Sequence, residues 1–321
     1  MNRFNVVMTS PALAPAAVSL LEAAGCMVHY TEAYPSGVAI AALAADVQAD
    51  AILARQGRVT REAIVASPRL RIVARHGVGT DEVDLEAAAL HGVLVTNAPG
   101  TNTAAVAEHT LALILALAKD LKPLGQAVGA GAWRGAASRT RDVAGMRLGL
   151  VGCGAIGRAV ARLAAAFGLE VAAYDPAMPA EGLPAIASAS SLSGLAARSD
   201  ILSLHCPLTE GTRGLVDAAI LSAMPAGGFV VNTARGGILD ETALIAALDS
   251  GQIAGAGLDV FDVEPPAADS PLRNHPHVLV TPHLAGVSVA SLEAMGVAAA
   301  ECIVLALGGG LVPPERIVVR A

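Results

Sequence analysis

Short, continuously apolar runs alternate with Ala-rich segments of helical spacing in the first third of the chain. The apolar runs predict β-strands at 5–8, 27–30, 51–54, 70–74 and 93–96. The segments between them predict helices at 13–24, 39–45, 61–66 and 84–90. Because the strands are apolar throughout, rather than alternating with polar residues, we expect a parallel sheet with helices on both faces.

A second series of strands and helices follows a break at 97–100, where the chain reads Asn-Ala-Pro-Gly. A long helix is predicted over 103–119. The segment 125–142, which is rich in Gly, Ala and Arg and contains Trp133, is expected to be an arm or connector. Further strands are predicted at 147–151, 170–174, 201–205, 228–232, 254–259 and 278–281, then a helix at 289–307 and a closing strand at 317–319. The pattern predicts an α/β protein of two Rossmann-like domains, with a ligand in the cleft between them.

Composition and charge narrow the class of protein. The chain has 321 residues, of which 54% are hydrophobic and 15% charged, and this excludes an intrinsically disordered protein. Its net charge is -7 and no Lys/Arg run exceeds two residues, so we expect neither nucleic acid nor a membrane as partner. The four cysteines lie far apart, which favours a reducing, cytoplasmic setting. The apolar stretch 296–312 contains Glu301 and is not expected to span a membrane.

A glycine-rich motif follows the first strand of the second series. Gly152-x-Gly154-x-x-Gly157 lies between an apolar strand and a segment of helical period, as a dinucleotide-binding fingerprint requires. Gly152 permits a tight turn, Gly154 lets the backbone approach a pyrophosphate, and Gly157 lets the helix pack closely. Asp175 ends the next strand, where a carboxylate binds the adenosine ribose and repels a 2′-phosphate. The motif predicts NAD as cofactor; a plain tight turn with a surface Asp175 is the structural alternative.

Three charged or titratable residues follow other strands of this series. Arg235 and His283 each come a few residues after a predicted strand, and Glu264 lies in a proline-rich turn after another. Ligands of open α/β sheets bind outside the carboxyl ends of the strands, so we expect all three side chains at one crevice. A histidine can exchange the hydroxyl proton of a 2-hydroxy acid, a carboxylate can orient its ring, and an arginine can grip the substrate carboxylate. Taken singly, each is more often structural than catalytic, and only the shared location favours catalysis.

Other groups could be functional in principle. His275 and His277 precede His283 in sequence, but the three fall at both ends of one predicted strand, so no metal site is expected. Gly77-x-Gly79 also follows a strand but lacks a third glycine, and it predicts a backbone anion nest rather than a second nucleotide site.

Further motifs are distributed over nearly the whole chain. They are Gly77-Val78-Gly79-Thr80-Asp81-Glu82-Val83-Asp84, Asn97-Ala98-Pro99-Gly100-Thr101-Asn102, Ala105-Val106-Ala107-Glu108-His109-Thr110, Leu204-His205-Cys206-Pro207-Leu208-Thr209, Asn232-Thr233-Ala234-Arg235-Gly236-Gly237, Asp259-Val260-Phe261-Asp262-Val263-Glu264-Pro265-Pro266 and Thr281-Pro282-His283-Leu284-Ala285-Gly286. With the glycine fingerprint, they resemble the motifs of the D-isomer-specific 2-hydroxyacid dehydrogenases, a family that includes phosphoglycerate dehydrogenase and hydroxypyruvate/glyoxylate reductases.

The resemblance implies a discontinuous flavodoxin-like substrate domain, 1–98 with 286–321, and an NAD-binding doubly wound parallel sheet at 99–285. It implies an NAD-dependent oxidoreductase that transfers a hydride at C2 of a small D-2-hydroxy or 2-keto acid. The substrate would be of the hydroxypyruvate/glyoxylate type or 3-phosphoglycerate. A homodimer would form through the helix at 103–119 and the Trp133 arm.

The resemblance also implies roles for single residues. Arg235 would bind substrate, His283 would be the acid/base and Glu264 its partner. Gly77, Val78 and Gly79 would form the substrate loop, with backbone N–H groups of Val78 and Gly79 on the carboxylate. Residues implied to bind the cofactor are Gly152, Gly154, Ala155, Ile156, Gly157, Asp175, Cys206, Pro207, Thr212, Thr233, Ala234 and Asp259, the last of these near the nicotinamide carboxamide.

The chain departs from the family pattern at a few points. It ends at Ala321, and we expect it to lack the C-terminal regulatory domain of many phosphoglycerate dehydrogenases. Arg55 could meet a substrate phosphate, but Gln56 follows it where the phosphoglycerate enzymes tend to have serine. His76 could face the substrate or be a buried or helix-capping histidine.

The same motifs leave one alternative function, and the composition bears on the kind of substrate. An NAD(H)-sensing corepressor of the same architecture is the alternative function, and the complete Arg/Glu/His set speaks against it. With only eight aromatic residues, from 1 Trp, 3 Tyr and 4 Phe, and none of them in the catalytic set, we expect small polar acids to be preferred over phenylpyruvate.

Overall fold

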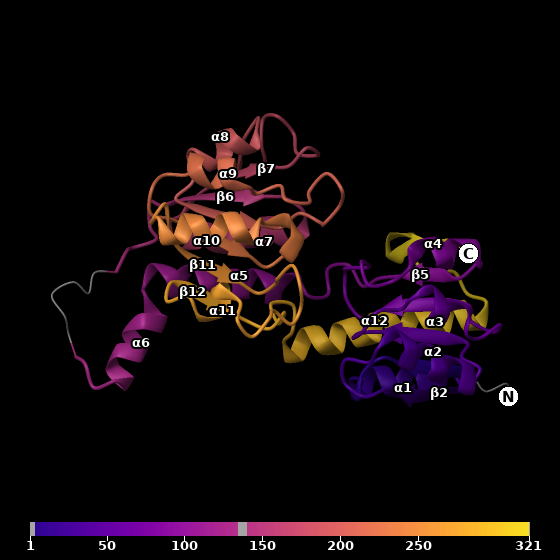
Figure 1. The fold of residues 1–321 in the computed structure, drawn as a ribbon. Helices are drawn as coiled ribbons and strands as arrows, with labels where there is room; N and C mark the ends of the chain where they lie inside the picture. Colours follow the sequence, from indigo (N-terminus) through magenta and orange to yellow (C-terminus); the bar gives the residue numbers. More distant parts are fainter. Residues whose placement is uncertain (1–3, 134–139, 321) are drawn as a thin grey trace. The chain divides into compact units, whose positions relative to one another are not determined.

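The computed structural model describes residues 4–133 and 140–320, and the chain forms two compact units. Unit 1 comprises the chain up to Asn102 together with Val287 onward, and unit 2 comprises Thr103–Gly286. The sequence placed the first boundary at residue 98, and the structure places it at the start of helix α5 (Thr103–Ala118). In Figure 1, unit 1 carries the indigo, purple and yellow ends of the chain and unit 2 the colours between them.

Unit 1 contains a six-stranded sheet of order β13-β5-β4-β3-β1-β2. Its strands are β1 (Phe4–Met8), β2 (Cys26–Tyr30), β3 (Ala51–Ala54), β4 (Ile72–Arg75), β5 (Leu94–Thr96) and β13 (Ile317–Val319). The first five strands pair in parallel, and β13 pairs with β5 in the antiparallel direction. The order 2-1-3-4-5 of the parallel strands is that of flavodoxin-like sheets, as expected.

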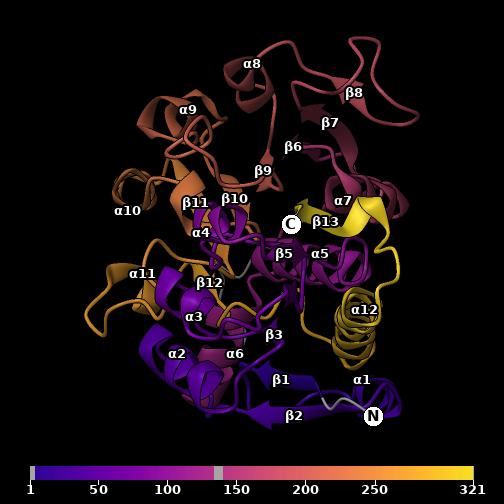
Figure 2. The same cartoon turned by 90° about the vertical axis from the view of Figure 1, so that its right-hand side faces the viewer.

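Successive residues of these strands face opposite helical layers, which explains the continuously apolar runs. Val6 and Met8 pack in a core cluster with α1 (Pro15–Ala23) and α12 (Val289–Gly308), whereas Val7 packs in the cluster of the other layer. That layer consists of α2 (Gly37–Asp46), α3 (Arg61–Val65) and α4 (Leu85–Leu90). Figure 2 shows α2 and α3 on one side of the strands and α1 and α12 on the other.

Helix α12 is long and apolar enough to cross a membrane by length and composition, and it alone is so among the described helices. Its packing gives another reason for this composition. Ala299, Ala300, Cys302 and Ile303 are buried in the core of unit 1. Glu301, on the same helix, receives a hydrogen bond of 2.7 Å from Arg316. The apolar composition of α12 is therefore explained by its packing in the hydrophobic core of unit 1.

Unit 2 contains a seven-stranded parallel sheet of order β12-β11-β10-β9-β6-β7-β8. Its strands are β6 (Arg147–Val151), β7 (Glu170–Tyr174), β8 (Ala187–Ser188), β9 (Ile201–Leu204), β10 (Gly228–Asn232), β11 (Ile253–Leu258) and β12 (Val278–Val280). Counted from β6, the order 3-2-1-4-5-6 is that of dinucleotide-binding sheets, and the strand order reverses between β6 and β9. The predicted doubly wound fold is thereby confirmed.

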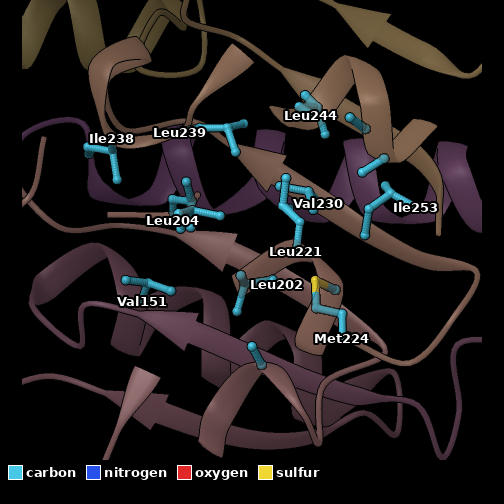
Figure 3. Packing of buried hydrophobic residues seen from close by; sticks show 14 of the residues in the cluster. Val151, Leu202, Leu204, Leu221, Met224, Val230, Ile238, Leu239, Leu244 and Ile253 are labelled. Atoms are coloured by element: carbon cyan, nitrogen blue, oxygen red, sulfur yellow. The ribbon is translucent and has the colours of Figure 1, made fainter. Parts of the chain in front are cut away.

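Helices cover both faces of this sheet as well. One core cluster joins Leu150 and Val231 to α5 and α7 (Ala155–Ala166). The other joins Leu202, Leu204 and Val230 to α8 (Leu192–Ala196), α9 (Ala218–Ala223) and α10 (Glu241–Asp249). Figure 3 shows this second cluster, with Leu221 and Leu244 of the helices beside Leu202, Leu204 and Val230 of the strands.

The segment 125–142, expected to be an arm or connector, begins within a helix that the sequence pattern did not predict. Helix α6 (Leu121–Gly129) extends into this segment and has no buried residue. Leu121, Leu124 and Val128 have helical spacing, but Pro123 and the neighbouring glycines conceal it in the sequence. Trp133 is 80% exposed, and 134–139 lie outside the described residues. Strand β8 and helix α11 (Pro271–Asn274) are short, and the sequence pattern did not predict them.

Candidate active site

The three predicted catalytic residues follow three neighbouring strands. Strands β10, β11 and β12 lie side by side in unit 2, and the segments after their carboxyl ends carry Arg235, Glu264 and His283 in that order. Because the strands are parallel, these segments emerge at the same edge of the sheet. The structure therefore brings the trio together within one unit.

His283 and Glu264 form a close ion pair. The Nδ1 atom of His283 lies 2.6 Å from Oε2 of Glu264, with 48% and 36% of the two side chains exposed. The hydrogen bond to Glu264 raises the pKa of His283 against the opposing effect of its burial. Burial would raise the pKa of Glu264, but the hydrogen bond from His283 and its charge lower that pKa overall. Since the Glu264 carboxylate accepts from Nδ1, Nε2 is the ring nitrogen available for proton exchange.

Asp259 holds the segment that carries His283. It is 1% exposed, and its carboxylate accepts hydrogen bonds from the hydroxyl of Thr281 and the amides of Leu284 and Ala285. The backbone of His283 has a φ of +52°, a left-handed conformation that needs such support in a non-glycine residue. The family resemblance implies that Asp259 lies near the nicotinamide carboxamide, and this stays a prediction. The sequence did not predict the contacts with the His283 segment, because they join residues more than twenty positions apart.

Asn232 and Gly236 shape the loop of Arg235, and the sequence alone predicted no role for either. Asn232 is 1% exposed, donates to the Arg235 carbonyl at 2.8 Å and accepts from the Ala234 amide at 3.0 Å. A Cβ at Gly236 would lie 2.0 Å from the carbonyl carbon of Phe261, so only glycine permits this approach. The loop of Arg235 is thus packed directly on the turn that carries Glu264. The opposite charge of Arg235 also helps to lower the pKa of Glu264.

The glycine-rich turn follows β6, where the strand order of the sheet reverses. Gly152 has a φ of +96°, and a Cβ there would lie 2.7 Å from the Cys206 amide nitrogen. A Cβ at Gly157 would lie 2.4 Å from the Gly152 carbonyl oxygen, whereas one at Gly154 would meet nothing within 4 Å. Gly154 is the N-cap of α7 and offers no capping side chain. The turn thus has the form of a phosphate cradle, with open space at Gly154 and α7 pointing its amino end at it.

The remaining predicted cofactor residues lie near this edge of the sheet. Ala155 and Ile156 begin α7. Asp175 directly follows β7 and accepts hydrogen bonds from the amides of Cys153 at 2.7 Å and Ala177 at 2.9 Å. The other predicted cofactor residues follow β9 and β10, and they are Cys206, Pro207, Thr212, Thr233 and Ala234.

Several of these side chains have protein partners. Thr212 donates to the Pro207 carbonyl at 2.6 Å, and the Thr233 hydroxyl lies 2.9 Å from that of Thr110. Burial raises the pKa of Cys206 to about 11, so its thiol stays protonated. Within unit 2, the glycine cradle, the acid at Asp175 and the surrounding small side chains fit a dinucleotide. The contacts of the single residues with NAD stay predictions.

The predicted substrate residues of unit 1 follow β3 and β4. Gly77 has a φ of +142°, and Arg75 donates to the Gly79 carbonyl at 2.8 Å. Arg55 donates to the Ser10 hydroxyl at 3.3 Å. His76 is buried, with 7% of the residue exposed. It is the only buried titratable residue of the predicted substrate set, which consists of Arg55, His76, Gly77, Val78 and Gly79.

Burial is the main cause that lowers the pKa of His76 to about 4, and the charge of Arg55 adds to it. The ring lies against α12, where a Cβ at Gly296 would be 3.5 Å from its Nε2 atom. Of the two readings left open by the sequence, this placement favours the buried histidine. A direct role of His76 in substrate binding stays a prediction.

No group of three or more His, Cys, Asp or Glu side chains that could hold a metal ion is found among residues 4–133 and 140–320. His275 lies 3.7 Å from Asp249, and the His275 and His277 rings are 5.9 Å apart.

Comparisons with known proteins agree with this geometry. Residues 111–285 match the family model for the D-isomer specific 2-hydroxyacid dehydrogenase, NAD binding domain. The chain is 43% identical over 273 residues to the D-3-phosphoglycerate dehydrogenase of Mycobacterium leprae, covering 84% of this chain and 52% of that protein. It is 38% identical over 264 residues to the hydroxypyruvate reductase of Thermotoga maritima, covering 81% and 86%.

A crystal structure of a protein from Thermus thermophilus is similar with a TM-score of 0.90 and 34% identity, covering 98% of this chain and 100% of that one. The chain spans about half the length of the phosphoglycerate dehydrogenases it matches. The family match covers more than half of the chain and includes the glycine fingerprint and the three predicted catalytic residues. The chain therefore belongs to the D-isomer-specific 2-hydroxyacid dehydrogenase family.

Proposed function

We propose that the protein is an NAD-dependent oxidoreductase that interconverts a small D-2-hydroxy acid and its 2-keto acid. The observation that carries this proposal is the His283–Glu264 pair at 2.6 Å beside Arg235, at the same sheet edge as the glycine cradle. NAD, when bound, supplies the hydride acceptor for oxidation and, in its reduced form, the donor for reduction.

The residues of the chain supply the proton and the charges. In oxidation, Nε2 of neutral His283 takes the proton of the C2 hydroxyl, and in reduction the imidazolium returns it. Glu264 stabilises the imidazolium and fixes the ring. Arg235 pairs with the substrate carboxylate and stabilises negative charge on the C2 oxygen. The Val78 and Gly79 amides of unit 1 are proposed as further donors to that carboxylate.

The proposed substrates are of two kinds. One is hydroxypyruvate or glyoxylate, and the other is 3-phosphoglycerate, whose phosphate would need a cation such as Arg55. The named relatives include one enzyme of each kind. Side-by-side assays of 3-phosphoglycerate oxidation and of hydroxypyruvate, glyoxylate, pyruvate and phenylpyruvate reduction distinguish them. Arg55→Ala should raise KM for 3-phosphoglycerate alone if Arg55 binds the phosphate.

The same assays test the function itself. Turnover of at least one small 2-keto acid, with phenylpyruvate the poorer substrate, is the expected result. Tight NADH binding without turnover of any 2-keto acid would instead support the NAD(H)-sensing corepressor. Repeating the panel with NADPH tests the cofactor preference proposed from Asp175, since a carboxylate there repels the 2′-phosphate.

We also propose a cytoplasmic homodimer without nucleic acid or membrane as partner. The net charge of -7 and the scattered cysteines support the setting. Leu121 and Val128 of α6 are 58% and 54% exposed, and Trp133 is 80% exposed, which suits a surface covered by a second copy. Light scattering after gel filtration tests the dimer, and Leu121→Glu should shift it toward monomer.

A further inference from the structure

Glu241 contacts the turn 261–264, which carries Glu264, and it has no role in the proposed mechanism. It is the first residue of α10, and its side chain is half-buried. Its Oε1 atom accepts a hydrogen bond of 2.8 Å from the backbone amide of Asp262, in the turn that follows β11. A half-buried carboxylate that accepts a hydrogen bond from a backbone amide distant in sequence restricts the orientation of that peptide group.

Two adjacent amides of this turn are each held by a carboxylate. The Phe261 amide donates to Oε1 of Glu264 at 3.1 Å, and the Asp262 amide donates to Glu241. The other oxygen of Glu264 faces His283 at 2.6 Å. The position of the Glu264 carboxylate therefore depends on how the backbone of Phe261 and Asp262 is oriented, and Glu241 fixes one of those two peptide groups.

A simpler role for Glu241 would be to stabilise the start of α10. Acidic side chains in the first turn interact favourably with the helix dipole. However, α10 already has an N-cap, since Oδ1 of Asp240 accepts from the Ala243 amide at 3.0 Å. The two roles make different demands on Glu241, because the dipole needs a negative charge and the Asp262 amide needs only an acceptor oxygen.

We propose that Glu241 is a positioning residue that orients the Asp262 peptide and thereby holds Glu264 in line with His283. This inference rests on the proposed function, because it assigns Glu241 to the same acid/base pair. The charged groups that face His283 are Glu264 and Asp259, which both follow β11, and Arg235, which follows β10. The charged group that faces Glu241 is Asp262. Glu241 thus acts on the histidine through geometry rather than through its own charge.

Three variants separate the roles. Glu241→Ala removes the acceptor, Glu241→Gln keeps an acceptor oxygen without the charge, and Asp240→Ala removes the cap of α10 but leaves the Asp262 contact. For each, kcat and KM for the best 2-keto acid are measured as a function of pH, and NADH affinity by fluorescence titration. The His283 imidazole is also titrated by NMR in the NADH complex, with its signal assigned by loss in His283→Gln.

Glu241→Ala should lower kcat by about 10-fold to 100-fold, because a small misplacement of a catalytic group has effects of this size. It should leave NADH affinity unchanged and move both the alkaline decline of kcat and the NMR midpoint to lower pH. Glu241→Gln should restore most of the activity and the profile. Asp240→Ala should lower thermal stability without moving either midpoint.

Wild-type kcat and midpoints in Glu241→Ala would overturn the proposal. So would equal damage in Glu241→Gln, which would assign the effect to charge, or the same midpoint shift in Asp240→Ala, which would assign it to the stability of α10. If wild-type protein turns over no 2-keto acid, the proposed function fails. The NMR midpoints still decide whether Glu241 positions the Glu264–His283 pair.

Discussion

Replacing Asp259 with alanine should destabilise unit 2 and disorder the segment that carries His283. The 1% exposed carboxylate accepts from Thr281, Leu284 and Ala285, with 2.8 Å to each of the two amides. Ala285 is buried, so its unpaired amide would cost about 1–3 kcal/mol. Thr281 and Leu284 are partly open to water, and their lost bonds would each cost about 0.5–1.5 kcal/mol. The sum is about 2–6 kcal/mol.

Urea unfolding followed by far-UV circular dichroism measures this loss, and keto-acid reduction measures its effect on His283. Asp249→Ala is the matched control, because Asp249 has 69% of its side chain exposed and lies 3.7 Å from His275. Its unfolding free energy should stay within about 0.5 kcal/mol of the wild-type value. An Asp259→Ala protein as stable as this control would refute the assignment of Asp259 as the support of the His283 segment.

Three further predictions concern the cofactor turn, the acid/base pair and the core. Gly157→Ala should weaken NADH binding about 10-fold or more, since its Cβ would lie 2.4 Å from the Gly152 carbonyl oxygen; fluorescence titration measures the Kd. Because Glu264 raises the pKa of His283 above 6.5, reduction should decline as pH rises through that raised pKa, and Glu264→Gln should move the decline in the pH–rate profile to lower pH. Leu244→Ala, at a fully buried site, should lower the unfolding free energy by about 2–5 kcal/mol in urea titrations.

Much of the fold was predictable because nearly all strands of the two sheets pair in parallel and helices cover both faces of each sheet. Strands buried on two sides read as continuous apolar runs, and β6, β7 and β10 have the predicted ends. Short or solvent-exposed elements were not predictable in this way. Helix α6 buries no residue and contains Pro123 and two glycines, which mask its helical spacing, and β8 spans two residues.

The candidate site was predictable where topology alone brings residues together. Arg235, Glu264 and His283 follow the adjacent strands β10, β11 and β12. Because these strands are parallel, their carboxyl ends lie at the same edge of the sheet, and the three residues are expected there. The supports of this site were not predictable, because they depend on hydrogen bonds that only the folded structure shows. Asn232 is recognisable only through its bonds to its own loop, and Glu241 only through its bond to a turn 21 residues away.

The acid/base role of His283 is tested by the rate at which His283→Ala oxidises NADH with hydroxypyruvate, measured together with the NADH affinity of this variant. Removal of a general acid should lower kcat by about 100-fold to 10,000-fold. NADH affinity should stay unchanged, because the glycine cradle follows β6, away in the sheet from β12, which precedes His283. Near-normal turnover by His283→Ala would contradict the assignment of His283 as the acid/base.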